Sequence, residues 1–205
     1  PGQPEARRIH VFQSPTPYRH SLQLEELGRR AEADIESPVA KQVPRGNAAA
    51  DFQNFIEWGI HEYPAEHYMV VVWGHGKGFN GLAFSDSDKS HLSIPDLTQA
   101  LRQAELNYLN GARIDVYASD ACLMQVAEVA VELSESARFI VGSSQVQNFF
   151  GLPYRRIMFE INTGNFAGER NTRGVRGSQL ADDEPYLLAR ILPRLMRQSL
   201  QVGGL

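Results

Sequence analysis

The sequence predicts an α/β fold in which helices flank a mostly parallel central sheet. The first observation is the run Tyr68–Trp73 (YMVVVW), which is continuous, apolar and rich in β-branched residues. Strands that are buried on both faces of a parallel sheet have this composition. The second observation is the alternation of strand and helix patterns over residues 50–142. Such alternation implies parallel strands joined by right-handed helical crossovers, and therefore three layers, α/β/α.

The elements before this run are predicted from local periodicity. Arg8–Phe12 alternates and predicts a short strand. Residues 14–47 contain four prolines and predict a surface excursion, with a charged helical patch around Leu22–Ile35. Residues Ala50–His61 carry apolar side chains at the spacing of one helix face. We expect that helix to end before Pro64.

The remaining elements complete the predicted sheet. Ser93 is the expected N-cap of a helix that has Pro95 in its first turn. Then follow a strand at Ala112–Ala118, a helix at Met124–Leu133 and a third strand at Arg138–Gly142.

The sequence signal weakens beyond Gly151. Asn162–Ser178 is rich in Gly, Asn and Arg and predicts a mobile loop. Tyr186–Leu200 predicts a closing helix, which Pro193 is expected to kink or break.

The composition is that of an ordinary globular domain. A chain of 205 residues is long enough for one substantial domain and short for two, so we expect a single domain over residues 1–205. The net charge of −4 shows no bias toward nucleic acid. No apolar run approaches the roughly 20 residues of a membrane span. The chain begins at Pro1, which predicts a fragment or a processed piece, and a secreted or periplasmic location is preferred over a cytoplasmic one.

The chain contains a single cysteine, Cys122. One cysteine excludes an internal disulfide and argues against a cysteine-based zinc site. Cys122 follows the second predicted strand, and His75 follows the first, with one helical crossover between them. Ligand sites in open α/β sheets form at the carboxyl edge of the strands, so the two residues are expected to meet there.

Three physical effects would make this pair reactive. Cys122 precedes a predicted helix, and we expect the helix dipole and a nearby imidazolium to stabilise its thiolate. Glycines flank His75, and backbone N–H groups there can contribute to an oxyanion hole. Nothing in this arrangement requires a metal.

Each of these residues also has an ordinary structural interpretation. A free cysteine is most often a buried small hydrophobe. The Gly-His-Gly sequence around His75 can form a tight turn, and Asp120 can simply cap the following helix. From the residues alone, a catalytic Cys–His pair and a structural role have equal weight. The joint placement of all three residues at equivalent strand ends favours the catalytic interpretation.

The same residues carry a resemblance to a known family. The segments YPAEHYMVVVWGHGKGF (Tyr63–Phe79) and DVYASDACLMQVAEVA (Asp115–Ala130) resemble the clostripain family of cysteine peptidases, which shares a caspase-like fold. Residues 82–101 and 138–154 give weaker support. The resemblance implies that His75 is the catalytic histidine and Cys122 the nucleophile. It also implies that the backbone amides of Gly76 and Cys122 form the oxyanion hole.

The resemblance further implies a substrate preference. Asp120 matches a family aspartate in the pocket for the residue before the scissile bond, and an acidic pocket favours Arg or Lys. Ser143 and Ser144 are expected in the same pocket, where relatives often carry acidic residues. Serine in place of an acid at these two positions would weaken the preference for basic substrates.

Two regulatory features of relatives have candidate residues here. Some relatives cleave themselves after a basic residue, and the candidates are Arg170, Arg173 and Arg176, although a solvated basic loop is the favoured alternative. Some depend on calcium, but Asp86 and Asp88 alone are far from a complete calcium loop. We therefore expect no cofactor.

The expected function is that of a cysteine endopeptidase that cleaves peptides or proteins after Arg or Lys. The family usually begins with another strand before the region of Arg8, so an N-terminal segment or a second chain is a candidate partner. The alternative is a catalytically inactive caspase-like interaction module, or a fragment that needs a partner segment. An α/β-hydrolase or nucleotide-binding domain is disfavoured because G-x-S-x-G, G-x-G-x-x-G and Walker motifs are absent.

Overall fold

The computed structural model describes residues 8–13, 18–23, 41–42, 47–84, 89–147, 151–163 and 184–202. In these ranges the strands form two three-stranded sheets. In the first sheet, β4 (Met69–Trp73), β5 (Ile114–Asp120) and β6 (Ala137–Val141) are parallel, with β5 in the middle. The three strand predictions and their parallel pairing are confirmed.

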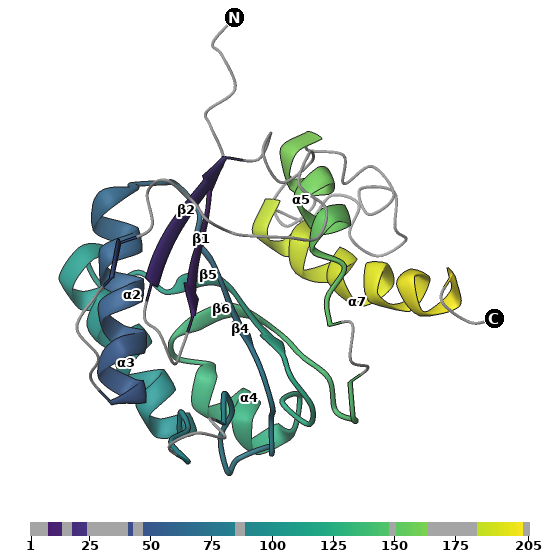
Figure 1. The fold of residues 1–205 in the computed structure, drawn as a ribbon, viewed down its shortest axis with the longest axis horizontal. Helices are drawn as coiled ribbons and strands as arrows, with labels where there is room; N and C mark the ends of the chain where they lie inside the picture. The colour runs from purple at the N-terminus through teal and green to yellow at the C-terminus, as the bar shows by residue number, and fades with distance from the viewer. Residues whose placement is uncertain are drawn as a thin grey trace, which may run out of the picture.

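Helices cover both faces of this parallel sheet (Figure 1). One face carries α2 (Ala48–Glu62), α3 (Ile94–Tyr108) and the short α4 (Ala127–Leu133). The other face carries α5 (Tyr154–Thr163) and α7 (Glu184–Val202). The predicted three-layer α/β/α architecture is confirmed.

Alternate strand residues supply two separate apolar clusters. In β4, Val70 and Val72 are buried with the side chains of α2 and α3, whereas Met69 and Val71 pack against the cluster of α5 and α7. Every residue of β5 is buried. Burial on both faces explains why β4 is continuously apolar in the sequence.

Side-chain caps fix the beginnings of two helices. Ser93 accepts a hydrogen bond from the backbone N–H of Asp96 at 3.2 Å, and α3 begins at the next residue with Pro95 in its first turn, as predicted. Asn47 accepts a hydrogen bond from the N–H of Ala50 at 2.8 Å and caps α2 in the same way.

The helix after Cys122 does not begin where the sequence predicted. It begins at Ala127 rather than Met124, because the N–H groups of Leu123 and Gln125 donate to carbonyls of the loop after β6 instead of entering a helix. The expectation that a helix dipole acts directly on Cys122 is therefore wrong. Asp120 is the last residue of β5, so its interpretation as a cap of that helix is also wrong.

The N-terminal region contains strands that the sequence analysis did not predict. β1 (Arg8–Gln13) confirms the first predicted strand, but it pairs antiparallel with β2 (Tyr18–Gln23), which pairs with β3 (Lys41–Gln42). The predicted surface excursion over residues 14–47 therefore includes the two strands β2 and β3. The predicted helical patch begins inside β2, whose sequence YRHSLQ alternates in the way that suits a strand. Residues 24–40 lie outside the described ranges.

The C-terminal third also differs from expectation. Helix α5 was not predicted, and it includes Asn162 and Thr163, for which the sequence predicts a loop. The rest of that predicted loop lies outside the described residues. Helix α7 continues through Pro193, so the proline does not end it.

Candidate functional site

The register of β4 and β5 places the two candidate catalytic residues on adjacent loops. Trp73 and Asp120 are paired in the parallel ladder, and His75 and Cys122 each lie two residues beyond that pair. The N–H of Gly74 donates to the carbonyl of Asp120 at 3.3 Å, which extends the ladder into the loops. The prediction that both residues emerge at the same carboxyl edge is therefore confirmed.

Gly76 brings the histidine loop into direct contact with the cysteine turn. A Cβ at this position would collide with the carbonyl oxygen of Cys122 and would lie 2.9 Å from the sulfur of Met124. Only glycine fits this approach of backbone to backbone. The loop is held further by the N–H of Ala83, which donates to the carbonyl of His75 at 2.9 Å. The His75 side chain is exposed at this edge.

Cys122 lies in a tight turn directly after β5. Leu123 has a φ of +61°, a left-handed conformation that costs a non-glycine residue free energy. The N–H groups of Leu123 and Gln125 donate to the carbonyls of Gln145 and Ser143 at 3.1 and 3.0 Å. The turn is therefore fixed by the loop that follows β6. The thiol itself is half-buried.

Gln147, from that same loop, lies against the sulfur. Its backbone N–H is 3.2 Å from Sγ of Cys122, and its carbonyl oxygen is 4.0 Å from the same atom. The loop therefore contacts the candidate nucleophile as well as the turn that holds it.

Asp120 is buried beside this turn, with 3% of its surface exposed. Its Oδ1 accepts a hydrogen bond from Nε2 of Gln147 at 2.5 Å. Its Oδ2 accepts from the N–H of Leu152 at 2.9 Å and from the hydroxyl of Tyr154 at 2.8 Å. No lysine, arginine or histidine within the described ranges contacts this carboxylate.

Two neighbours fit closely around Asp120. Burial, together with the adjacent negative charge of Asp120, raises the pKa of the Tyr154 phenol above its usual range, so the hydroxyl keeps its proton and donates. Gly151 has a φ of +66°, and a Cβ there would lie 2.5 Å from Oδ2 of Asp120. A larger residue would displace the carboxylate.

The predicted pocket serines do not contact Asp120 through a described hydrogen bond. The hydroxyl of Ser143 donates to the carbonyl of Gln145 at 3.0 Å and accepts from its N–H at 3.2 Å, and Ser144 is exposed. The residues that contact Asp120 are Gln147, Leu152 and Tyr154, which sequence reasoning did not single out. Their position after the third parallel strand was the available signal.

The candidate calcium ligands and self-cleavage sites lie outside the part of the chain that the structure describes. Asp86 and Asp88 lie outside the described residues, as do Arg170, Arg173 and Arg176. The described part of the chain contains no group of three or more His, Cys, Asp or Glu side chains that could hold a metal ion. Within the same ranges, no helix has the length and apolar character that crossing a membrane requires.

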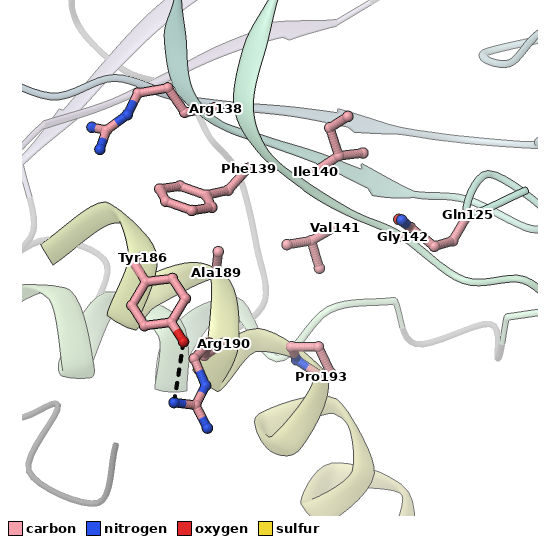
Figure 2. Close-up of a pocket in the computed structure, with 10 residues that line it drawn as sticks. All are labelled: Gln125, Arg138, Phe139, Ile140, Val141, Gly142, Tyr186, Ala189, Arg190 and Pro193. Atoms are coloured by element: carbon pink, nitrogen blue, oxygen red, sulfur yellow. Dashed lines mark hydrogen bonds between the residues drawn. The ribbon is translucent and has the colours of Figure 1, made fainter. Parts of the chain in front are cut away.

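A cavity of about 410 Å³ lies between β6 and α7 and extends to Gln125 of the cysteine turn (Figure 2). Phe139 and Val141 line it from the strand, and Ala189 and Pro193 line it from the helix. His75, Asp120 and Cys122 do not line it. The candidate site is therefore defined by the two strand-end loops rather than by this cavity.

A known protein family matches the part of the chain that contains His75 and Cys122. The sequence profile of the clostripain family matches residues 19–172. The curated proteins that were compared include no match to this chain.

This chain is also similar to solved structures. A secreted C11 cysteine protease from Bacteroides thetaiotaomicron, in complex with an irreversible peptide inhibitor, is 20% identical with a TM-score of 0.55 and covers 86% of this chain and 52% of its own. The "iotapain" structure is also of a secreted C11 cysteine protease from that organism. It is 16% identical with a TM-score of 0.51, and the match covers 87% of this chain and 49% of that protein. An inactive zymogen C11 protease from Parabacteroides distasonis is 26% identical with a TM-score of 0.49. The match covers 75% of this chain and 42% of that protein. The chain thus spans about half the length of these proteins or less.

Proposed function

Because the chain belongs to the clostripain family, we propose that it is a cysteine endopeptidase in which Cys122 is the nucleophile and His75 the acid–base partner. The observation that carries the proposal is the adjacency of their loops, which leave paired strands and touch through Gly76. A buried structural cysteine would not need a strained turn next to the loop of an exposed histidine.

The proposed reaction proceeds through a thioester. His75 takes the proton of the Cys122 thiol, the thiolate sulfur attacks the scissile carbonyl carbon, and the carbonyl π electrons move to its oxygen. The backbone N–H groups of Gly76 and Cys122 would stabilise that oxyanion. As the C–N bond breaks, His75 gives a proton to the leaving amine. Water then attacks the thioester, His75 accepts a proton from it, and the thiolate leaves.

Asp120 supports a preference for Arg or Lys before the scissile bond. It is a buried carboxylate that receives hydrogen bonds from neutral donors, and among the described side chains no cation contacts it. Burying an anion without a counter-charge costs free energy, and a basic substrate side chain would supply that charge. Ser143 and Ser144 remain candidates for the rim of the pocket.

Kinetics with small reporter peptides test the proposal. Wild-type protein is expected to hydrolyse a reporter with Arg before the cleaved bond, and Cys122→Ala and His75→Ala are each expected to lower kcat by about a thousandfold or more. His61→Ala is the matched control, because His61 is an exposed histidine on α2. Hydrolysis by Cys122→Ala at the wild-type rate would exclude Cys122 as the nucleophile.

A catalytically inactive interaction module, or a fragment that needs a partner segment, is the second candidate. Alkylation of the single thiol across pH separates the two functions, since a catalytic thiolate reacts with iodoacetamide well below the pH at which an ordinary thiol does. Intact mass of the wild type against Cys122→Ala tests self-cleavage after Arg170, Arg173 or Arg176. New ends in the wild type alone would support it.

The same comparison supports a proposal about location and substrate. The Bacteroides thetaiotaomicron relative is described as secreted and was solved with a peptide inhibitor. Both descriptions support a peptide or protein substrate met outside the cytoplasm.

A further inference from the structure

Gln147 contacts the candidate nucleophile and the candidate specificity residue together. Its side-chain amide donates to Oδ1 of Asp120 at 2.5 Å, and its backbone N–H lies 3.2 Å from Sγ of Cys122. Its own carbonyl oxygen is 4.0 Å from the same sulfur. One residue therefore has its side chain on the acid and its backbone at the thiol.

This is the placement that a substrate residue before the scissile bond would need. Its side chain would reach the acidic pocket while its backbone lay against the attacking sulfur. We propose that Gln147 occupies, in the resting chain, the position of that substrate residue, so that a basic substrate must displace Gln147 from Asp120 before it can bind. The proposal rests on the proposed function, because it assumes that Asp120 receives the substrate side chain.

The two oxygens of Asp120 have separate partners, which makes the exchange feasible. Oδ2 is held by Leu152 and Tyr154, and neither bond involves Gln147. Oδ1 receives only the Gln147 amide among the described hydrogen bonds. The carboxylate therefore keeps its position when Gln147 leaves, and Oδ1 becomes available to a guanidinium or ammonium group.

Gln147 is also a weaker occupant than a basic side chain. Its Oε1 is buried and has no hydrogen-bond partner among the described residues, a condition that disfavours the closed arrangement. Its amide is neutral, so it leaves the charge of Asp120 uncompensated, whereas Arg or Lys would form a charge-assisted bond. A basic substrate side chain therefore displaces Gln147 from Asp120, whereas a neutral side chain does not.

The test removes the amide while keeping the packing. Gln147→Met has similar length without the donor, and Gln147→Ala removes the side chain. For both, KM for an Arg reporter is expected to fall about tenfold, with kcat nearly unchanged, because the competing hydrogen bond to a charged group is lost. Val146→Ala is the matched control, because Val146 is the neighbouring residue and is 80% exposed.

A second measurement does not depend on hydrolysis. Agmatine, a small guanidinium compound, is titrated calorimetrically, and its Kd is expected to be about tenfold lower for Gln147→Met than for the wild type. Unchanged KM and unchanged agmatine Kd in an active enzyme would overturn the Gln147 proposal and leave the proposed function intact. Tighter agmatine binding in a protein without Cys122-dependent hydrolysis would support the Gln147 proposal at the pocket while the proposed activity failed.

Discussion

Trp73 and Asp120 are register partners of the parallel pair β4–β5, so their side chains leave the sheet on the same face at its carboxyl edge. The two differ sharply in exposure: Asp120 is 3% exposed and Trp73 is 71% exposed. An indole left in solvent beside a buried acid is placed to contact whatever approaches that acid.

Replacement of Trp73 tests this placement. Trp73→Ala is expected to raise KM for an Arg reporter about three- to tenfold with little effect on kcat, because the indole face attracts a cationic side chain. Val131→Ala on α4 is the matched control, since Val131 is also 71% exposed. Equal KM for the two variants would remove Trp73 from the binding surface.

Gly76 provides a test of the contact between the two loops. Gly76→Ala places a Cβ against the carbonyl of Cys122, so one loop must shift, and kcat/KM is expected to fall about a hundredfold. Gly59→Ala is the control, because nothing lies within 4 Å of a Cβ there and the position is helical. That control is expected to stabilise the protein by about 0.5–1 kcal/mol in urea unfolding. Full activity in Gly76→Ala would contradict the tight contact.

Replacement of Tyr154 tests the hydrogen bonds that hold Oδ2 of Asp120. Tyr154→Phe removes one of the two donors to Oδ2, and the free energy of unfolding is expected to fall by about 1–3 kcal/mol because a buried carboxylate loses a partner. KM for a basic reporter is expected to rise as the carboxylate becomes less well oriented. Tyr108→Phe, at an exposed tyrosine, serves as the control in both urea unfolding and kinetics.

Glu105 predicts a pH dependence of stability that is separate from the active site. It is 3% exposed, its Oε1 accepts from the N–H of Ile114 at 3.2 Å, and burial raises its pKa to about 7. The folded protein therefore holds a proton that the unfolded chain releases near pH 4.5. The contribution of protonated Glu105 to the free energy of unfolding is complete below pH 4.5 and is lost as pH rises to about 7. The free energy of unfolding therefore declines across that window.

Glu105→Gln should remove this decline, because Gln keeps the acceptor oxygen without a titrating proton. Above pH 7 the variant is expected to be more stable than the wild type by about 2–3 kcal/mol. Urea unfolding at pH 5 and pH 8 measures the difference, with the exposed Glu62→Gln as control. The same pH slope in wild type and Glu105→Gln would contradict the assignment.

The sequence predicted the parallel sheet and its edge well because both depend on strong, local signals. β4 is apolar on both faces, and the chain order of strand, helix and strand leaves few topologies, so the adjacency of the His75 and Cys122 loops followed. The Ser93 cap was equally local. These features need no knowledge of distant contacts.

The surroundings of the site could not be predicted, because they depend on long-range pairing. Whether residues 123–126 form a helix is decided by carbonyls about 20 residues later, on the loop after β6. The partners of Asp120 come from 27 to 34 residues away. The strand β2 was missed because the charged residues that follow it suggested a helix.

The two backbone bonds between the cysteine turn and the loop after β6 have a practical consequence. The N–H groups of Leu123 and Gln125 are protected from hydrogen–deuterium exchange only while that loop stays paired with the turn. Their deuterium uptake, measured with and without a bound basic ligand, would therefore record each opening of the loop. These two amides are therefore native probes of the site, and neither requires a mutation or an attached reporter group.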